Sequence, residues 1–143
     1  MIMTPERLQL EKQVLASKLP SNIYRFMDMD KPEPYLIMAA RTNRGKIYTI
    51  KIMLNEFPNT KPEVYVNKML YTKHGTPMDG PSADMHTLSA RDNCTQICHY
   101  GDNAWTPMLS LYKVYVRCRL WLEIYDLHLE TGNNMDYYLD HAY

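Results

Sequence analysis

The segment KIYTIKIML, residues 46–54, constrains the fold most, because its side chains alternate in character along the chain. Tyr48, Ile50, Ile52 and Leu54 fall on one side of an extended backbone, while Thr49 and Lys51 belong to the other side. Alternation with a period of two over this length is typical of a strand that has one face on a core. The chain is therefore expected to contain a sheet with one covered face.

Other short segments predict further strands near this one. They lie at residues 22–30, 35–40 and 63–67. The sequence TNRG (42–45) is typical of a turn, and FPNTKP (57–62) is excluded from regular structure by its two prolines. Together these segments predict an antiparallel meander of up to four strands.

Helices are predicted at both ends of the meander. Thr4 is a good N-cap and Pro5 suits the first helical position, so a helix is expected over residues 5–18. Apolar residues recur at steps of three and four from Pro107 to Thr131, and Gly132 is a natural stop signal, which predicts a long helix over 107–131.

The intervening residues 71–106 are rich in glycine, proline and small polar side chains, and we expect a long, largely irregular active-site loop there. The tail after Gly132 is predicted to form a short helix or an ordered strap. This order of elements indicates one α+β domain that spans residues 1–143.

Composition excludes several function classes. The 143 residues include 16 Lys plus Arg and 16 Asp plus Glu, so the formal net charge is zero. Such a balance does not favour a nucleic-acid partner. The charged N-terminal segment lacks the apolar core of a signal peptide, and no apolar run reaches membrane-spanning length. Together with the small, odd number of cysteines, these features predict a cytoplasmic protein without a membrane partner.

Three cysteines are candidates for chemistry: Cys94, Cys98 and Cys118. Cys118 lies within the apolar pattern of the long predicted helix and is expected in the core. Cys98 lies in QICHYGDNAWTP (96–107), just before turn-forming residues, and Cys94 is its competitor. A thiolate is both a good nucleophile and a good leaving group, so a cysteine suits acyl transfer between thioesters. His86 and His99 are candidates for activating it.

Three longer motifs carry a family resemblance. YTIKIMLNEFPNTKPEVYVNKML (48–70) resembles the passage from strand to Phe-Pro turn to Pro-Glu-Val strand of ubiquitin-conjugating enzymes. ICHYGDNAWTPMLSL (97–111) is similar to the active-site segment of that family, and LWLEIYDLHLETG (120–132) is similar to the C-terminal helix of its bacterial members. Among these, the chain most resembles the conjugating enzymes of CBASS anti-phage operons.

The resemblance implies roles for individual residues. Cys98 matches the cysteine that carries the thioester, and His86 matches the histidine that opens the eukaryotic His-Pro-Asn motif. The remaining matches are Tyr100, Trp105 and Pro107 around the cysteine, and Trp121, Leu122, Thr131 and Gly132 in the helix pattern. The sequence departs from the family at His86-Thr87-Leu88, where the oxyanion-stabilising asparagine is missing, so that role is unassigned.

The resemblance also implies a function and its partners. Cys98 would accept the C-terminal glycine of a cGAS-like nucleotidyltransferase, or of a ubiquitin-like protein, either from an activating enzyme or directly from a partner complex. The domain itself would need no cofactor. Three alternatives stay open: conjugation of a bacterial ubiquitin-like protein outside CBASS, a non-catalytic binding module of the same fold, and a zinc site formed by His86, Cys94, Cys98 and His99.

Overall fold

The structure, a computed structural model, describes residues 3–139. Three helices and six strands make up its regular structure. In chain order they are α1 (Pro5–Lys18), β1 (Tyr24–Met27), β2 (Tyr35–Arg41), β3 (Ile47–Met53), β4 (Val64–Val66), β5 (Thr87–Arg91), β6 (Cys94–Ile97), α2 (Leu111–Thr131) and α3 (Asp136–Leu139). Short 3₁₀ turns occupy Ser21–Ile23 and Asp102–Ala104. The α+β class predicted from the sequence is confirmed.

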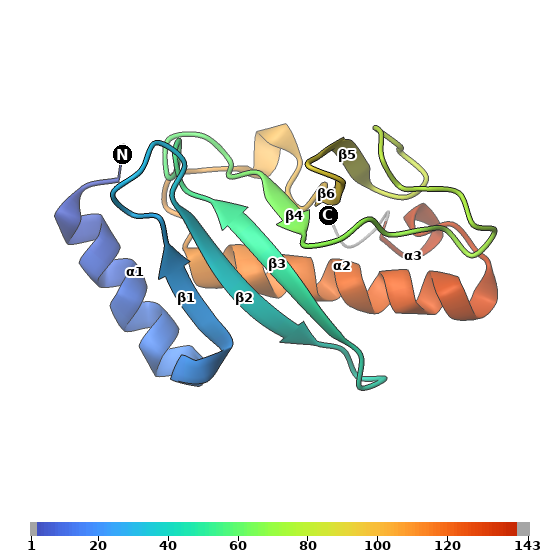
Figure 1. Ribbon diagram of the computed structural model, residues 1–143, viewed down its shortest axis with the longest axis horizontal. Coiled ribbons are helices and arrows are strands. Elements are labelled where there is room, and N and C mark those ends of the chain that lie inside the picture. Colours follow the sequence, from blue (N-terminus) through green and yellow to red (C-terminus); the bar gives the residue numbers. More distant parts are fainter. Residues whose placement is uncertain (1–2, 140–143) are drawn as a thin grey trace.

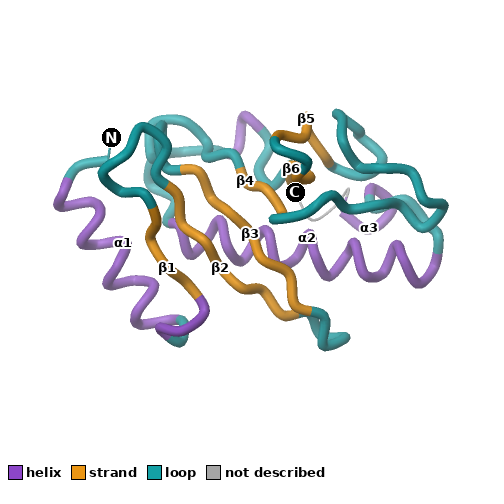
Figure 2. The backbone as a smooth tube through the Cα atoms, viewed as in Figure 1, coloured by secondary structure: helices purple, strands orange, loops and turns teal. Residues whose placement is uncertain are grey.

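The strands form one antiparallel sheet in the order β1-β2-β3-β4-β6-β5. The long helix α2 crosses one face of the sheet, and α1 lies beside the β1 edge (Figure 1). The backbone trace shows how long connections surround the short strands β4, β5 and β6 (Figure 2). We call the face covered by α2 the inner face and the opposite one the outer face.

The alternation in β3 is confirmed as the signal of a half-covered strand. Tyr48, Ile50, Ile52 and Leu54 are all buried in the core. The Tyr48 hydroxyl donates a 2.6 Å hydrogen bond to Oδ1 of Asp126 on α2, so the sheet and the helix are also joined by a buried polar contact. Burial raises the pKa of Tyr48, with this hydrogen bond adding to the effect.

Helix α1 begins and ends as its sequence predicts. Pro5 occupies its first turn, and Oγ1 of Thr4 accepts a 3.1 Å hydrogen bond from the Arg7 N–H. That bond satisfies one of the donors that a helix start leaves unpaired.

The start of the long helix was predicted wrongly, because Pro107 is not its first residue. Ser110 is the N-cap and accepts a hydrogen bond from the Lys113 N–H, so α2 begins at Leu111. The residues before it form a turn in which the Leu109 N–H bonds to the Thr106 carbonyl. At the other end Gly132 has φ +80° and caps the helix as expected.

The prediction of four strands and an irregular 71–106 loop was also wrong. Residues 87–97 form the hairpin β5–β6, which pairs with β4. Its two-residue connection is Asp92-Asn93, and both residues have positive φ, +53° and +57°. Positive φ at both positions is the requirement of a type I′ turn, and Asp and Asn tolerate that conformation better than most residues. This dipeptide was the sequence signal for the hairpin.

The C-terminal tail forms the short helix α3, in agreement with the prediction, and residues 140–143 lie outside the described residues. Among residues 3–139, no helix combines the length and apolar character that crossing a bilayer needs.

The two faces of β3 provide a test of the fold. Ile50 is fully buried, whereas Ile47 is 65 % exposed on the same strand. Ile50→Ala should lower the free energy of unfolding by about 2–4 kcal/mol, because it leaves a cavity between the sheet and α2. Ile47→Ala, the matched control, should change it by less than about 0.5 kcal/mol. Chemical denaturation measures both, and equal losses would mean that the strand's faces are misassigned.

Candidate functional site

Cys98 lies directly after β6, at the end of a strand in the sheet. Its backbone N–H donates a 3.0 Å hydrogen bond to the His86 carbonyl, one step beyond the ladder pair of Thr87 and Ile97. Directly opposed residues of an antiparallel pair have Cα atoms about 4.5–5.5 Å apart. The sheet therefore brings Cys98 and His86 together, although they are separated by a complete hairpin in sequence. The Cys98 side chain is partly buried.

The His86 backbone adopts an unusual conformation that two hydrogen bonds hold in place. Its φ is +51°, in the left-handed region that costs an L-residue on the order of 1 kcal/mol. Its carbonyl accepts the Cys98 N–H and also the indole N–H of buried Trp121, at 2.9 Å. Strained backbone of this kind persists where the surroundings fix it, and it is frequent at functional sites.

The His86 imidazole contacts a carboxylate that the sequence analysis missed. His86 Nε2 lies 2.7 Å from Oδ1 of Asp136, at the start of α3. The Asp136 N–H donates to the Asp84 carbonyl, which fixes α3 against the segment that leads to His86. A carboxylate on one ring nitrogen holds the imidazole in a single orientation. The sequence predicted a short helix in the tail, but no motif there marks Asp136 as a partner of His86.

His99, the second candidate base, is buried and points to a different partner. Its Nε2 lies 2.7 Å from the Pro62 carbonyl, so Nε2 carries the proton. Burial, with a smaller effect from the nearby cations Lys61 and Arg117, lowers the pKa of His99 from an ordinary value of 6.5 to about 4, although the hydrogen bond to Pro62 acts in the opposite direction. Its Nδ1 has no hydrogen-bond partner among the described residues. At neutral pH this imidazole is uncharged and acts as a packing group.

Tyr100 and Trp105 form an aromatic cluster after the cysteine. The two rings meet edge to face with centroids 6.0 Å apart, and Trp105 meets Phe57 in the same way at 6.1 Å. The indole N–H of Trp105 donates to the Pro58 carbonyl at 3.2 Å. The Arg117 guanidinium lies over the Tyr100 ring at 4.4 Å. Trp105 thus joins the segment after Cys98 to the Phe-Pro turn.

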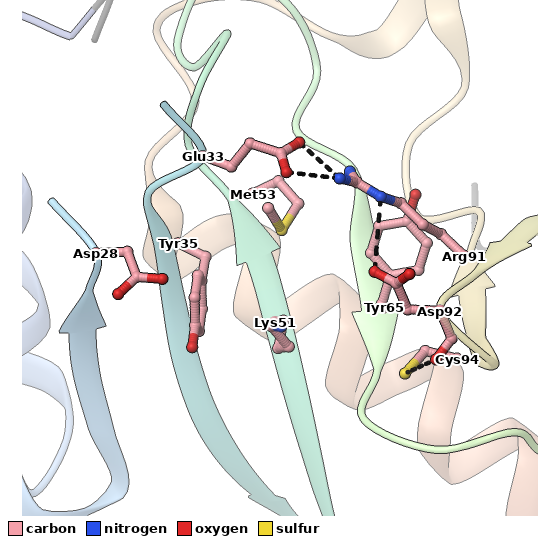
Figure 3. Close-up of a pocket in the computed structure, with 9 residues that line it drawn as sticks. All are labelled: Asp28, Glu33, Tyr35, Lys51, Met53, Tyr65, Arg91, Asp92 and Cys94. Atoms are coloured by element: carbon pink, nitrogen blue, oxygen red, sulfur yellow. Dashed lines mark hydrogen bonds and ion pairs between the residues drawn. The ribbon is translucent and has the colours of Figure 1, made fainter. Parts of the chain in front are cut away.

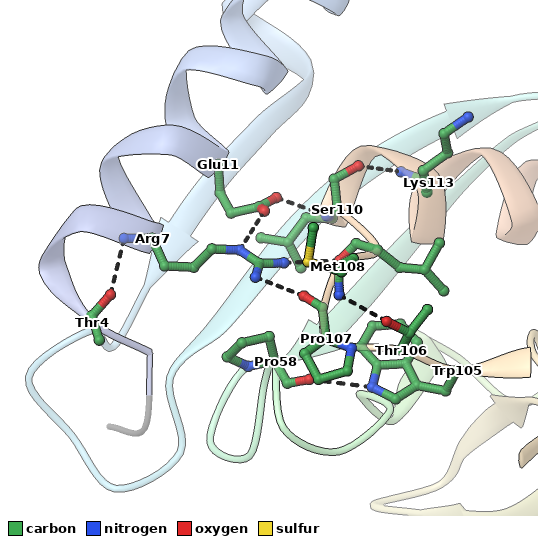
Figure 4. A network of polar contacts seen from close by, with 12 residues as sticks. Thr4, Arg7, Glu11, Pro58, Trp105, Thr106, Pro107, Met108, Ser110 and Lys113 are labelled. Atoms are coloured by element: carbon green, nitrogen blue, oxygen red, sulfur yellow. Dashed lines mark hydrogen bonds and ion pairs between the residues drawn. The ribbon is translucent and has the colours of Figure 1, made fainter.

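An ion pair on α1 holds the far end of the same segment (Figure 4). Arg7 Nε lies 2.8 Å from Oε2 of Glu11, a carboxylate whose side chain is only 2 % exposed. The two other guanidinium nitrogens donate to the carbonyls of Pro107 and Leu109. Oε1 of Glu11 accepts the Leu111 N–H, at the start of α2. The buried charge is thereby paired and hydrogen-bonded, as stability requires.

Cys94, the competing thiol, belongs to a different surface. It lines a pocket of about 190 Å³ with Tyr35, Lys51, Tyr65 and Arg91, on the outer face of the sheet (Figure 3). There Nη2 of Arg91 donates to both carboxylate oxygens of Glu33. The Cys94 thiol lies 3.5 Å from the Asp92 carbonyl within its own turn, and neither Cys98 nor His86 lines this pocket.

The third thiol, Cys118, is fully buried on α2, and burial raises its pKa. This confirms the prediction that Cys118 is a core residue. As for metals, residues 3–139 contain no group of three or more His, Cys, Asp or Glu side chains placed to hold an ion.

A scan of known protein families, a search of curated protein sequences and a search of solved structures returned no significant match to this chain. The sequence motifs and the geometry around Cys98 are therefore the basis for a functional proposal.

The aromatic cluster provides a test of the site's construction. Trp105 is partly buried, so Trp105→Ala should lower the free energy of unfolding by about 2–3 kcal/mol, the lower range for losing a large aromatic ring. Trp105→Phe keeps ring contacts and loses only the bond to Pro58, so it should cost about 1 kcal/mol. Thermal or chemical denaturation measures both changes. Wild-type stability in both variants would show that Trp105 does not hold this segment.

Proposed function

We propose that this chain is a thioester-forming acyl carrier and transferase of the ubiquitin-conjugating type, with Cys98 as its nucleophile. The observation that carries the proposal is the hydrogen bond from the Cys98 N–H to the His86 carbonyl. This bond brings the backbone of Cys98 beside that of His86, whose imidazole contacts Asp136. A nucleophile, a nearby base and a third group that orients the base form the arrangement that covalent catalysis uses.

The proposed reaction starts from a protein whose C-terminal glycine is held as a thioester by another protein. His86 accepts the proton of the Cys98 thiol, and the sulfur attacks the thioester carbonyl. The new carbon–sulfur bond forms, the old one breaks, and the departing thiolate takes the proton from His86. In the second step an amine attacks the Cys98 thioester, gives its proton to His86, and the proton returns to the released thiolate. No redox step or cofactor is required.

The proposed acyl donor is the C-terminal glycine of a cGAS-like nucleotidyltransferase in bacterial anti-phage defence. This identification comes from the resemblance to CBASS conjugating enzymes, and so does the participation of an activating enzyme. Conjugation of a bacterial ubiquitin-like protein is the alternative within the same chemistry. Both donors present a C-terminal glycine, so the proposed reaction at Cys98 would be the same for each.

One observation favours a second candidate, a non-catalytic module of the same fold. The position of the family's asparagine is taken by Leu88, which lies within strand β5 and pairs with Gln96. A leucine side chain cannot stabilise an oxyanion. A module of this kind would bind the same partners and would form no covalent adduct with them.

The nucleophile is tested with a candidate donor and its activating enzyme. Wild-type protein should form an adduct that survives non-reducing electrophoresis and is lost on adding a thiol reductant. Cys98→Ser should abolish this adduct or replace it with a reductant-resistant oxyester, since serine forms an ester in place of a thioester. Cys94→Ser is the matched control and should load normally. If Cys94→Ser lost the adduct while Cys98→Ser still formed it, the nucleophile would be Cys94.

The role of His86 is tested without any partner protein. A short synthetic peptide that ends in a glycine thioester should transfer its acyl group to Cys98, as followed by intact-protein mass spectrometry. His86→Gln should slow this transfer about tenfold or more, since general-base catalysis contributes at least that much in most enzymes. Asp136→Asn should slow it less, because the imidazole remains. Melting temperatures close to wild type would show that the variants fold, and unchanged rates would exclude His86 as the base.

A further inference from the structure

A groove lies at the opposite end of the sheet from Cys98. Its volume is about 510 Å³. It is lined by Leu19 after α1, Ile23 before β1, Ala39, Arg41, Thr42, Asn43 and Ile47 of the β2–β3 hairpin, and Tyr115 and Arg119 of α2. The strand register places Ile97 at the Met53 end of β3, whereas the β2–β3 hairpin lies at the Ile47 end. A molecule held in the groove would leave Cys98 accessible.

The groove combines an apolar floor with positive charge. Leu19, Ile23 and Ala39 are partly buried, while Ile47 is 65 % exposed at the rim. Two arginines, Arg41 and Arg119, line it and no carboxylate does. Among the described residues, neither guanidinium forms an ion pair with a carboxylate. Protein-binding surfaces are enriched in Arg, aromatic and aliphatic side chains, with acidic side chains depleted.

Two backbone carbonyls at the groove already have hydrogen-bond partners, which disfavours one mode of binding. The last β1–β2 pair is Tyr24 with Met38, so β2 extends beyond the end of β1. Two carbonyls on this uncovered edge are taken by side chains of α2. The Tyr115 hydroxyl donates to the Ala39 carbonyl, and Arg119 Nη2 donates to the Arg41 carbonyl, both at 3.0 Å. An added strand would have to displace these bonds, so a partner would be recognised through its side chains.

We propose that this groove binds an acidic segment of a partner protein, in which carboxylates alternate with aliphatic side chains. The carboxylates pair with Arg41 and Arg119, and the aliphatic groups cover Ile47 and the floor beside Leu19. Charge complementarity selects this occupant, because two arginines without carboxylate partners line an apolar surface in a chain whose net charge is zero. The site acts as a recruitment surface and is independent of the chemistry at Cys98.

The test uses two short synthetic peptides, one alternating leucine with glutamate and the other alternating leucine with lysine. Each is titrated into the ¹⁵N-labelled full chain and followed by NMR. The glutamate peptide should bind saturably and shift the amides of Ile23, Ala39, Arg41 and Ile47, while the lysine peptide should not. No saturable binding of the glutamate peptide, or shifts confined to other surfaces, would overturn the proposal.

Two variants locate the contacts. Arg41→Glu should weaken binding of the glutamate peptide about tenfold or more, since it places like charges together. Lys113→Glu is the matched control, because Lys113 is an exposed cation on α2 that does not line the groove, and it should bind normally. Equal affinity in Arg41→Glu would contradict the proposal. A concentration-dependent dimer that Ile47→Ser abolishes would instead assign the groove to a second copy of the chain.

Discussion

The carbonyl oxygen of His86 is the atom on which the candidate site depends. It accepts the Cys98 N–H from the end of β6 and the Trp121 indole N–H from α2, so three separate segments meet at one acceptor. Because Trp121 is fully buried, its N–H would lose a hydrogen bond with no water to replace it if His86 moved. The same contact that stabilises the core therefore fixes the backbone opposite the thiol, including its left-handed conformation.

A second constraint acts on the other end of the active-site segment. Arg7 and Glu11 bind the carbonyls of Pro107 and Leu109 and the N–H of Leu111, which attaches this segment to α1. The chain between Cys98 and Leu111 is thus held by the sheet at its start and by a buried ion pair at its end. This explains how a segment with little regular structure holds a defined position, as the proposed acyl transfer at Cys98 would require.

The sequence predicted those parts of the fold that follow from local pattern. The alternation of Tyr48, Ile50 and Ile52 assigned the inner face of β3, and Thr4 and Gly132 marked helix ends through their capping chemistry. The β5–β6 hairpin was missed because its strands are short and lie among turn residues. The Asp92-Asn93 turn was the local signal that could have revealed it.

The candidate site was only partly predictable, because its contacts join distant segments. Cys98 and His86 were both identified as candidates, and the sheet brings their backbones together. His99 is adjacent to the cysteine in sequence, yet packing buries it against the Pro62 carbonyl. Asp136 reaches His86 only because α3 folds back onto the chain before β5, and Arg7 reaches Pro107 from a hundred residues away. No local pattern encodes such pairs, since they depend on tertiary packing.

The proposed role of Cys98 requires a thiol that is more reactive than that of Cys94. Both side chains are partly buried, so access alone does not separate them. The most direct measurement is the rate at which iodoacetamide alkylates each cysteine of the wild-type protein at pH 7, followed by peptide mass spectrometry. Cys98 should react about tenfold faster than Cys94 if His86 takes up the thiol proton as the sulfur attacks. Equal rates, or faster reaction at Cys94, would contradict it.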